Sequence, residues 1–260
     1  MAVFKHLIIL LSIANLQCFS TEKDSLKLFS DSTLALNIYT ANKYKKTYQY
    51  AVPVFLIGYG FTSMDKGISR QIDKGIEHEL QEKFRGFSTH IDDKLQYAPV
   101  MAVYALNLVS VKGKNNFIDR TAIYLIANSV SGFSVDFLKD KTRKLRPSGS
   151  DRRSFPSGHT ANAFVAAEFM RQEFKDVSPL YGYIGYSMAT ATGALRMMNN
   201  AHWFSDVIAG AGIGILSAKF SYFVYPWVKS KIIKNKDPDM MFMPTVQHGA
   251  FGFALIAPLN

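Results

Sequence analysis

The sequence of 260 residues contains one cysteine, Cys18. It lies in an N-terminal segment ordered like a secretory signal, with the cations Lys5 and His6, an apolar run over 7–16 and a cleavage point expected after Ser20. Removal of this segment leaves a chain without cysteine, which excludes disulfide bonds and thiol catalysis. An uncleaved anchor is the alternative, although the apolar run is too short to span a bilayer comfortably.

Spacings typical of metal sites and of nucleic-acid-binding modules are also missing. No carboxylate cluster or paired-histidine spacing indicates a metal, so we expect neither a metal nor another cofactor. No zinc-finger spacing or helix-turn-helix pattern is present, which argues against nucleic acid as a partner despite the formal net charge of +10. The basic charge then favours an anionic membrane surface or a phosphorylated substrate.

The β-branched alternation typical of strands is absent, and the apolar stretches have helical lengths, so we predict an all-α fold, a bundle of about six core helices. These stretches are 47–64, 95–111, 121–138, 161–170, 177–195 and 207–228. Residues 68–84 carry a large apolar side chain at every fourth position, which predicts an amphipathic helix docked on the core, with a membrane-surface helix as the alternative. The glycines and aromatics of 247–256 predict a short extended C-terminal tail.

We divide the chain into a signal peptide (1–20), a polar lead-in (21–46), a helical domain (47–230) and a C-terminal tail (231–260). Mean hydropathy is +0.02, low for a chain made mostly of membrane spans. Glu168 and Lys219 interrupt two of the apolar helices and argue against full spans there. We expect a membrane-associated protein of the periplasm and cell envelope, with an integral placement left open by the long apolar stretch 177–195.

Two short runs contain the residues that point to chemistry. In the first run, Lys139 and Arg146 are seven residues apart, so both can lie at one end of a helix that Pro147 ends. Arginine offers a fork to two phosphate oxygens, and lysine offers a point charge. The neighbouring cations are interpreted as solvated surface charges: Lys141, Arg143 and Lys144.

The first run ends in a Pro-Ser-Gly-His turn, which places Ser157 and Gly158 at a helix N-terminus, where free N–H groups attract anions. In the second run, His202 and Asp206 are four residues apart and are expected to share a helix face. Asp206 can then accept from one ring nitrogen and leave the other free to attack phosphorus. Arg196 lies six residues before His202.

The order Lys-x6-Arg-Pro, Pro-Ser-Gly-His and Arg-x5-His-x3-Asp resembles the type 2 phosphatidic acid phosphatase and vanadium haloperoxidase superfamily. One departure is Leu195, where the family often has serine. The resemblance implies a helical bundle with the site at one end. It also implies the following roles: Lys139, Arg146 and Arg196 bind phosphate with help from Ser157 and Gly158, His159 is the general acid, His202 is the nucleophile that forms a phosphohistidine, and Asp206 orients it.

From these features we predict a metal-independent phosphatase that hydrolyses phosphomonoester or diphosphate groups. The basic charge and apolar stretches favour a lipid-linked substrate such as lipid A, undecaprenyl diphosphate or phosphatidic acid. A soluble periplasmic acid phosphatase of broad specificity is the alternative. A vanadium haloperoxidase is disfavoured because such chains are usually longer, and a non-catalytic anion-binding envelope protein because both His159 and His202 are present.

Overall fold

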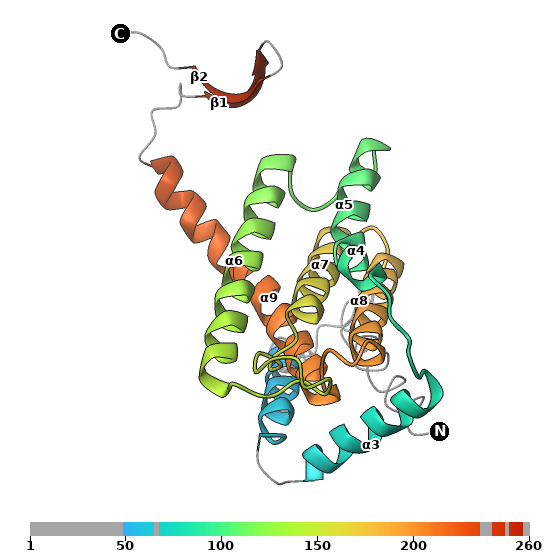
Figure 1. The fold of residues 1–260 in the computed structure, drawn as a ribbon. Coiled ribbons are helices and arrows are strands. Elements are labelled where there is room, and N and C mark those ends of the chain that lie inside the picture. The colour runs from blue at the N-terminus through green and yellow to red at the C-terminus, as the bar shows by residue number, and fades with distance from the viewer. Residues whose placement is uncertain (1–48, 65–67, 235–240, 248–249, 257–260) are drawn as a thin grey trace, which may run out of the picture. The chain divides into compact units, whose positions relative to one another are not determined.

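The computed structural model describes residues 49–64, 68–234, 241–247 and 250–256 (Figure 1). The predicted signal peptide and polar lead-in lie outside these residues. The chain divides into two compact units, and the boundary falls between Ser221 and Tyr222.

The first unit is built from helices. They are Gln49–Phe61, α3 (Ile68–Lys83), α4 (Ile91–Leu95), α5 (Ala98–Leu108), α6 (Phe117–Thr142), α7 (Gly158–Phe174), α8 (Leu180–Met198) and α9 (Phe204–Lys234), which continues into the second unit. Each apolar stretch predicted to be helical coincides with one of these elements, so the predicted all-α fold is confirmed.

The C-terminus of α6 shapes the loop that follows it. Arg143 adopts the left-handed conformation with φ of 44°, and its N–H donates to the carbonyl of Lys139 at 3.1 Å. This cap ends the helix at Thr142, before Arg146 is reached. The prediction that Pro147 ends the helix, with Arg146 on it, is therefore wrong.

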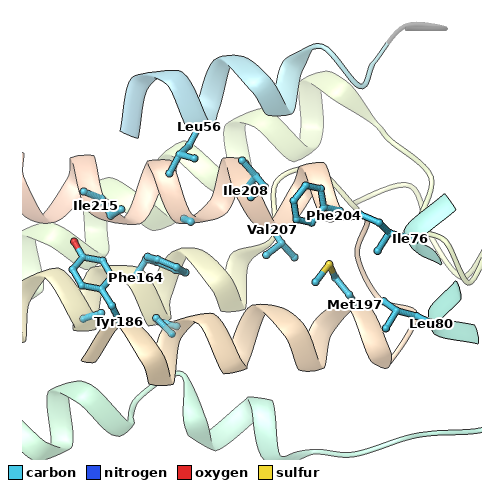
Figure 2. Packing of buried hydrophobic residues seen from close by; sticks show 14 residues of the cluster. Leu56, Ile76, Leu80, Phe164, Tyr186, Met197, Phe204, Val207, Ile208 and Ile215 are labelled. Carbon is cyan, nitrogen blue, oxygen red and sulfur yellow. The ribbon is translucent and has the colours of Figure 1, made fainter. Parts of the chain in front are cut away.

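α7 is a central helix of the first unit. It packs against α5, α6 and α8, and nearly all of its side chains are buried. Phe164 of α7 meets Tyr186 of α8 and Ile215 of α9 in one hydrophobic cluster, as Figure 2 shows. Burial on several sides explains why this helix lacks a single apolar face.

α3 contributes Ile76 and Leu80 to the same cluster, and each of these side chains is 3% exposed. Ile72 packs against them as a partly buried neighbour. The spacing of four residues therefore marks the face that docks on the core, as predicted. The alternative of a membrane-surface helix is not supported, because Ile76 and Leu80 of the apolar face are already buried in the core.

Glu168 of α7 and Lys219 of α9 form an ion pair inside the bundle. The Lys219 Nζ lies 3.1 Å from Glu168 Oε1, and Arg171 Nε donates to Glu168 Oε2 at 2.7 Å. Tyr186 also donates its hydroxyl to Oε2 at 2.6 Å. A paired interior charge does not report what surrounds the helix, so Glu168 and Lys219 alone do not decide whether these helices span a membrane, and the absence of full spans there stays a prediction.

Within the described residues, α6 and α9 are long and apolar enough to cross a membrane by length and composition. α6 exposes much of its apolar surface, with Leu125 at 60% and Phe133 at 75% exposure. In α9 most of the apolar window is buried. The uncovered face of α6 fits association with a membrane.

The second unit contains a β-hairpin at the end of the chain. β1 (Met241–Gln247) and β2 (Ala250–Ile256) pair antiparallel, with Gln247 opposite Ala250. The predicted extended tail is confirmed, although extended structure begins earlier, at Met241.

Candidate active site

His202 lies in the loop between α8 and α9, two residues before α9 begins, and its side chain is 1% exposed. Its Nδ1 is 2.7 Å from the carbonyl oxygen of Ser154 and 3.8 Å from Asp206 Oδ2. A carbonyl oxygen can only accept, so Nδ1 carries the hydrogen and Nε2 keeps its lone pair. The prediction that His202 and Asp206 share a helix face is wrong, because only Asp206 lies in α9.

Asp206 holds the segments around His202. Its Oδ2 accepts from the backbone N–H of Trp203 at 3.0 Å and from the Ser154 hydroxyl, and its Oδ1 accepts from Lys144 Nζ at 2.9 Å. Ser154 therefore contacts both members of the pair, with its hydroxyl toward Asp206 and its carbonyl toward His202. The sequence interpretation missed Ser154, whose one signal is its place two residues before the Pro-Ser-Gly-His turn.

Burial sets the protonation state of His202. It lowers the pKa of the imidazole to about 4, although Asp206 pulls the other way. The positive charges of Arg146 and Arg196 add to the lowering. The ring is therefore neutral at pH 7, which is the form that can act as a nucleophile.

Two arginines from separate elements approach this histidine. Arg146, in the loop after α6, donates from Nη1 to the carbonyl of Ala201 at 3.1 Å, and its Nε lies 2.8 Å from Asp151 Oδ2. Arg196 is in the last turn of α8. The positive charges of both arginines act on His202, so these two predicted cations lie within electrostatic reach of it.

The start of α7 faces Lys139. The helix begins at Gly158 with Ser157 as its N-cap, where the sequence places them. A Cβ built on Gly158 would lie 3.8 Å from Lys139 Nζ, so the ammonium lies beside the helix terminus, where N–H groups attract anions. The Ser157 hydroxyl is fully buried and lies 2.9 Å from Thr160 Oγ1, so it is turned into the helix and away from a ligand.

Two carboxylates of α4 pair with two of the predicted site residues, His159 and Arg196. Asp93 Oδ1 is 2.8 Å from His159 Nε2, and Asp92 Oδ2 is 2.6 Å from Arg196 Nη1. Burial lowers the pKa of His159, Arg196 lowers it further, and Asp93 opposes both. These aspartates were missed, because two adjacent acids at the start of a short helix carry no motif signal.

Ligand atoms of Asp92, Asp93 and His159 lie within 4.8 Å of one another, a cluster that the sequence did not indicate. Each of the two carboxylates has a partner in the protein, Arg196 for Asp92 and His159 for Asp93. A metal ion bound here would have to displace Arg196 from a buried pair, so these residues do not fit a metal site well.

A family model described as the PAP2 superfamily matches residues 31–230. The chain belongs to the PAP2 superfamily. The lipid A 1-phosphatase of Porphyromonas gingivalis is 31% identical to it over 226 residues, which cover 86% of this chain. This chain spans 46% of the length of that relative.

Two solved structures are similar to this PAP2 protein. The crystal structure of Aquifex aeolicus LpxE has 20% identity and a TM-score of 0.43, covering 56% of this chain and 93% of that one. The crystal structure of a transmembrane PAP2 type phosphatidylglycerolphosphate phosphatase from Bacillus subtilis has 18% identity and a TM-score of 0.47, covering 72% of this chain and 98% of that one. The family predicted from the three motifs is thus confirmed by the family model.

The site of this PAP2 protein combines a neutral imidazole with several positive donors. The parts are a free Nε2 on His202, the guanidinium groups of Arg146 and Arg196, the ammonium of Lys139 and the N-terminus of α7. Such donors can match the charge that spreads over the equatorial oxygens of a phosphoryl group during transfer.

Proposed function

We propose that this protein is a phosphatase that removes phosphate from a lipid-linked phosphomonoester or diphosphate through a phosphohistidine on His202. The supporting observation is the buried neutral imidazole, with its proton fixed on Nδ1 by the Ser154 carbonyl. Arg146 and Arg196 beside it supply the charge that a phosphate requires. The similarity to a protein named lipid A 1-phosphatase agrees with this chemistry.

In the first step, His202 Nε2 forms a bond to phosphorus while the bond to the leaving oxygen breaks. Lys139, Arg146 and Arg196 bind the equatorial oxygens together with the Gly158 N–H. His159 gives a proton to the leaving oxygen. In the second step, water gives a proton to His159 and attacks phosphorus, the bond between phosphorus and His202 Nε2 breaks, and inorganic phosphate is released.

Substrate binding would change the partners of the α4 carboxylates. Arg196 and His159 are paired with Asp92 and Asp93, and a phosphate dianion competes for the same donors. A dianion beside His159 favours its protonated form, which offsets the lowering of its pKa by burial. The general acid is therefore charged when substrate is present.

A lipid is the substrate class that the surface favours. α6 exposes apolar side chains close in sequence to Lys139, and the chain is strongly basic, as expected beside an anionic membrane surface. We further propose that the catalytic domain comprises residues 47–230 and works in the periplasm, with lipid A, undecaprenyl diphosphate and phosphatidic acid as candidate substrates.

A panel of substrates tests this function. Purified protein in detergent is given lipid A, undecaprenyl diphosphate, phosphatidic acid and p-nitrophenyl phosphate, and released phosphate is measured. We expect kcat/KM for one lipid to exceed that for p-nitrophenyl phosphate by at least about 100-fold, since the lipid adds binding energy away from the reacting group. Equal values across the panel would favour the broad-specificity acid phosphatase, and no release at all would refute the phosphatase.

Metal removal and vanadate give a second prediction. After EDTA treatment and desalting, activity should stay within about twofold of the untreated enzyme, because the cations of the site supply the charge stabilisation. Vanadate should inhibit, since it adopts the five-coordinate geometry of the transition state. Activity that is lost with EDTA and restored by magnesium would instead assign a metal to Asp92, Asp93 and His159.

A further inference from the structure

Lys144 lies in the loop after α6 and is 7% exposed, so its interpretation as a solvated surface charge is wrong. Its Nζ is surrounded by four oxygen atoms from distant parts of the chain. They are Ser63 Oγ at 2.9 Å, Asp73 Oδ2 at 3.2 Å, Ser205 Oγ at 2.8 Å and Asp206 Oδ1 at 2.9 Å. One buried cation is thus shared by two buried carboxylates.

The serine hydroxyls of this cluster have a defined direction. Ser63 donates to the carbonyl of Gly60 at 2.8 Å, and Ser205 donates to Asp73 Oδ2. Both hydroxyls therefore turn a lone pair toward the Lys144 ammonium, which can only donate. The cluster has partners for its polar atoms and one consistent arrangement of hydrogen bonds.

Asp73 connects α3 to the beginning of α9. Its carboxylate is 1% exposed, and Oδ1 accepts from the backbone N–H of Ser205 at 2.8 Å. It therefore caps a free N–H group in the first turn of α9, which also holds Asp206. Through Lys144, the same residue is tied to the loop after α6.

Lys144 also reaches His202 through its backbone. The carbonyl of Lys144 accepts from the Ser154 N–H at 2.9 Å, and the Ser154 carbonyl lies against His202 Nδ1. The side chain of Lys144 holds Asp206, while its main chain holds the residue that fixes the imidazole proton.

On the basis of the proposed function, we propose that Lys144 and Asp73 are positioning residues of the phosphatase. The ammonium of Lys144, shared by Asp73 and Asp206, holds the start of α9 and the Ser154 segment so that His202 presents Nε2 to phosphorus. Neither residue is expected to touch substrate, so their loss should lower kcat and leave KM unchanged.

The charges of the cluster indicate how removal of Lys144 would change the protonation of the two carboxylates. Without Lys144, Asp73 and Asp206 face each other with no cation, and such a pair keeps one proton until a higher pH. Burial already raises the pKa of Asp73, and Lys144 opposes this. The other titratable groups near the cluster are Tyr59, Glu77 and His202, and none of them can replace the cation while His202 stays neutral.

The experiment compares Lys144→Met, Asp73→Asn, the double variant and wild type on p-nitrophenyl phosphate and on the preferred lipid. Lys144→Met should lower kcat roughly 100-fold at neutral pH, the loss expected for a misplaced nucleophile, and less at acidic pH, where a proton replaces the ammonium. Adding Asp73→Asn removes the unpaired carboxylate, so the double variant should recover about tenfold and lose the extra pH dependence. Lys141→Met, at an exposed lysine three residues away, is the matched control and should match wild type.

Several outcomes would overturn the inference. If wild type is active and Lys144→Met has the same kinetics, the positioning role is refuted and the proposed phosphatase activity stands. If wild type is inactive, both the positioning role and the proposed function are refuted. A double variant slower than Lys144→Met would indicate a purely structural role. If Lys144→Met does not fold, the kinetics of Asp73→Asn alone test the positioning role. It keeps the side-chain shape and should lower kcat about tenfold at constant KM, and wild-type kinetics would contradict the proposal.

Discussion

Replacing His202 by alanine is expected to abolish phosphate release. The substitution removes the proposed nucleophile and leaves the phosphate-binding cations in place, so substrate should still bind. We expect kcat to fall by about 10⁴-fold, which corresponds to about 5 kcal/mol of additional barrier. Steady-state kinetics with the best lipid substrate and with p-nitrophenyl phosphate measure this loss.

His78→Ala is the matched control, because His78 lies on α3 with an exposed side chain. The wild-type pH profile gives a related check. A neutral imidazole is needed for attack, so activity should persist above the His202 pKa of about 4 and disappear as the pH falls through it. Substantial activity in His202→Ala would assign the nucleophile elsewhere.

The second large effect is expected for His159→Ala, and it depends on the leaving group. An alkoxide of a lipid needs a proton to leave, so the variant should lose about 10³-fold in kcat on lipid phosphates. p-Nitrophenolate leaves without one. With p-nitrophenyl phosphate the variant should release one equivalent of p-nitrophenol per enzyme in a burst and then turn over slowly, since the base for the water step is also missing.

Rapid-mixing measurements at 400 nm would resolve this burst. Equal losses on both substrate types, with no burst, would contradict the role of His159 as general acid. Asp93→Asn provides a graded comparison, because Asp93 Oδ1 contacts His159 Nε2 at 2.8 Å and lies outside the proposed phosphate-binding set. It should reduce kcat by less than the alanine variant.

The helices and the motif positions were predictable from the sequence because they depend on local patterns. The apolar period of α3 marked the residues that dock on the core, and the Pro-Ser-Gly-His turn marked the start of α7. Both signals lie within a few turns of the residue concerned.

The interior charges were not predictable in this way. Lys144 looks the same as its exposed neighbour Lys141 in the sequence, yet it is drawn inward by Asp73 and Asp206, which lie 71 and 62 residues away. Asp92 likewise meets Arg196 over a separation of 104 residues. Partners so distant are set by helix packing, which leaves no periodic signal at the charged residue itself.

The identity of the covalent intermediate tests the proposed mechanism most directly. His159→Ala should accumulate it from p-nitrophenyl phosphate, and the protein is then quenched in base, where phosphohistidine survives, digested and mapped by mass spectrometry. We expect phosphate on the peptide that contains His202, lost on acid treatment and absent when His202 is also replaced by alanine. Phosphate on any other residue, or an intermediate that survives acid, would contradict the assignment of His202 as the nucleophile.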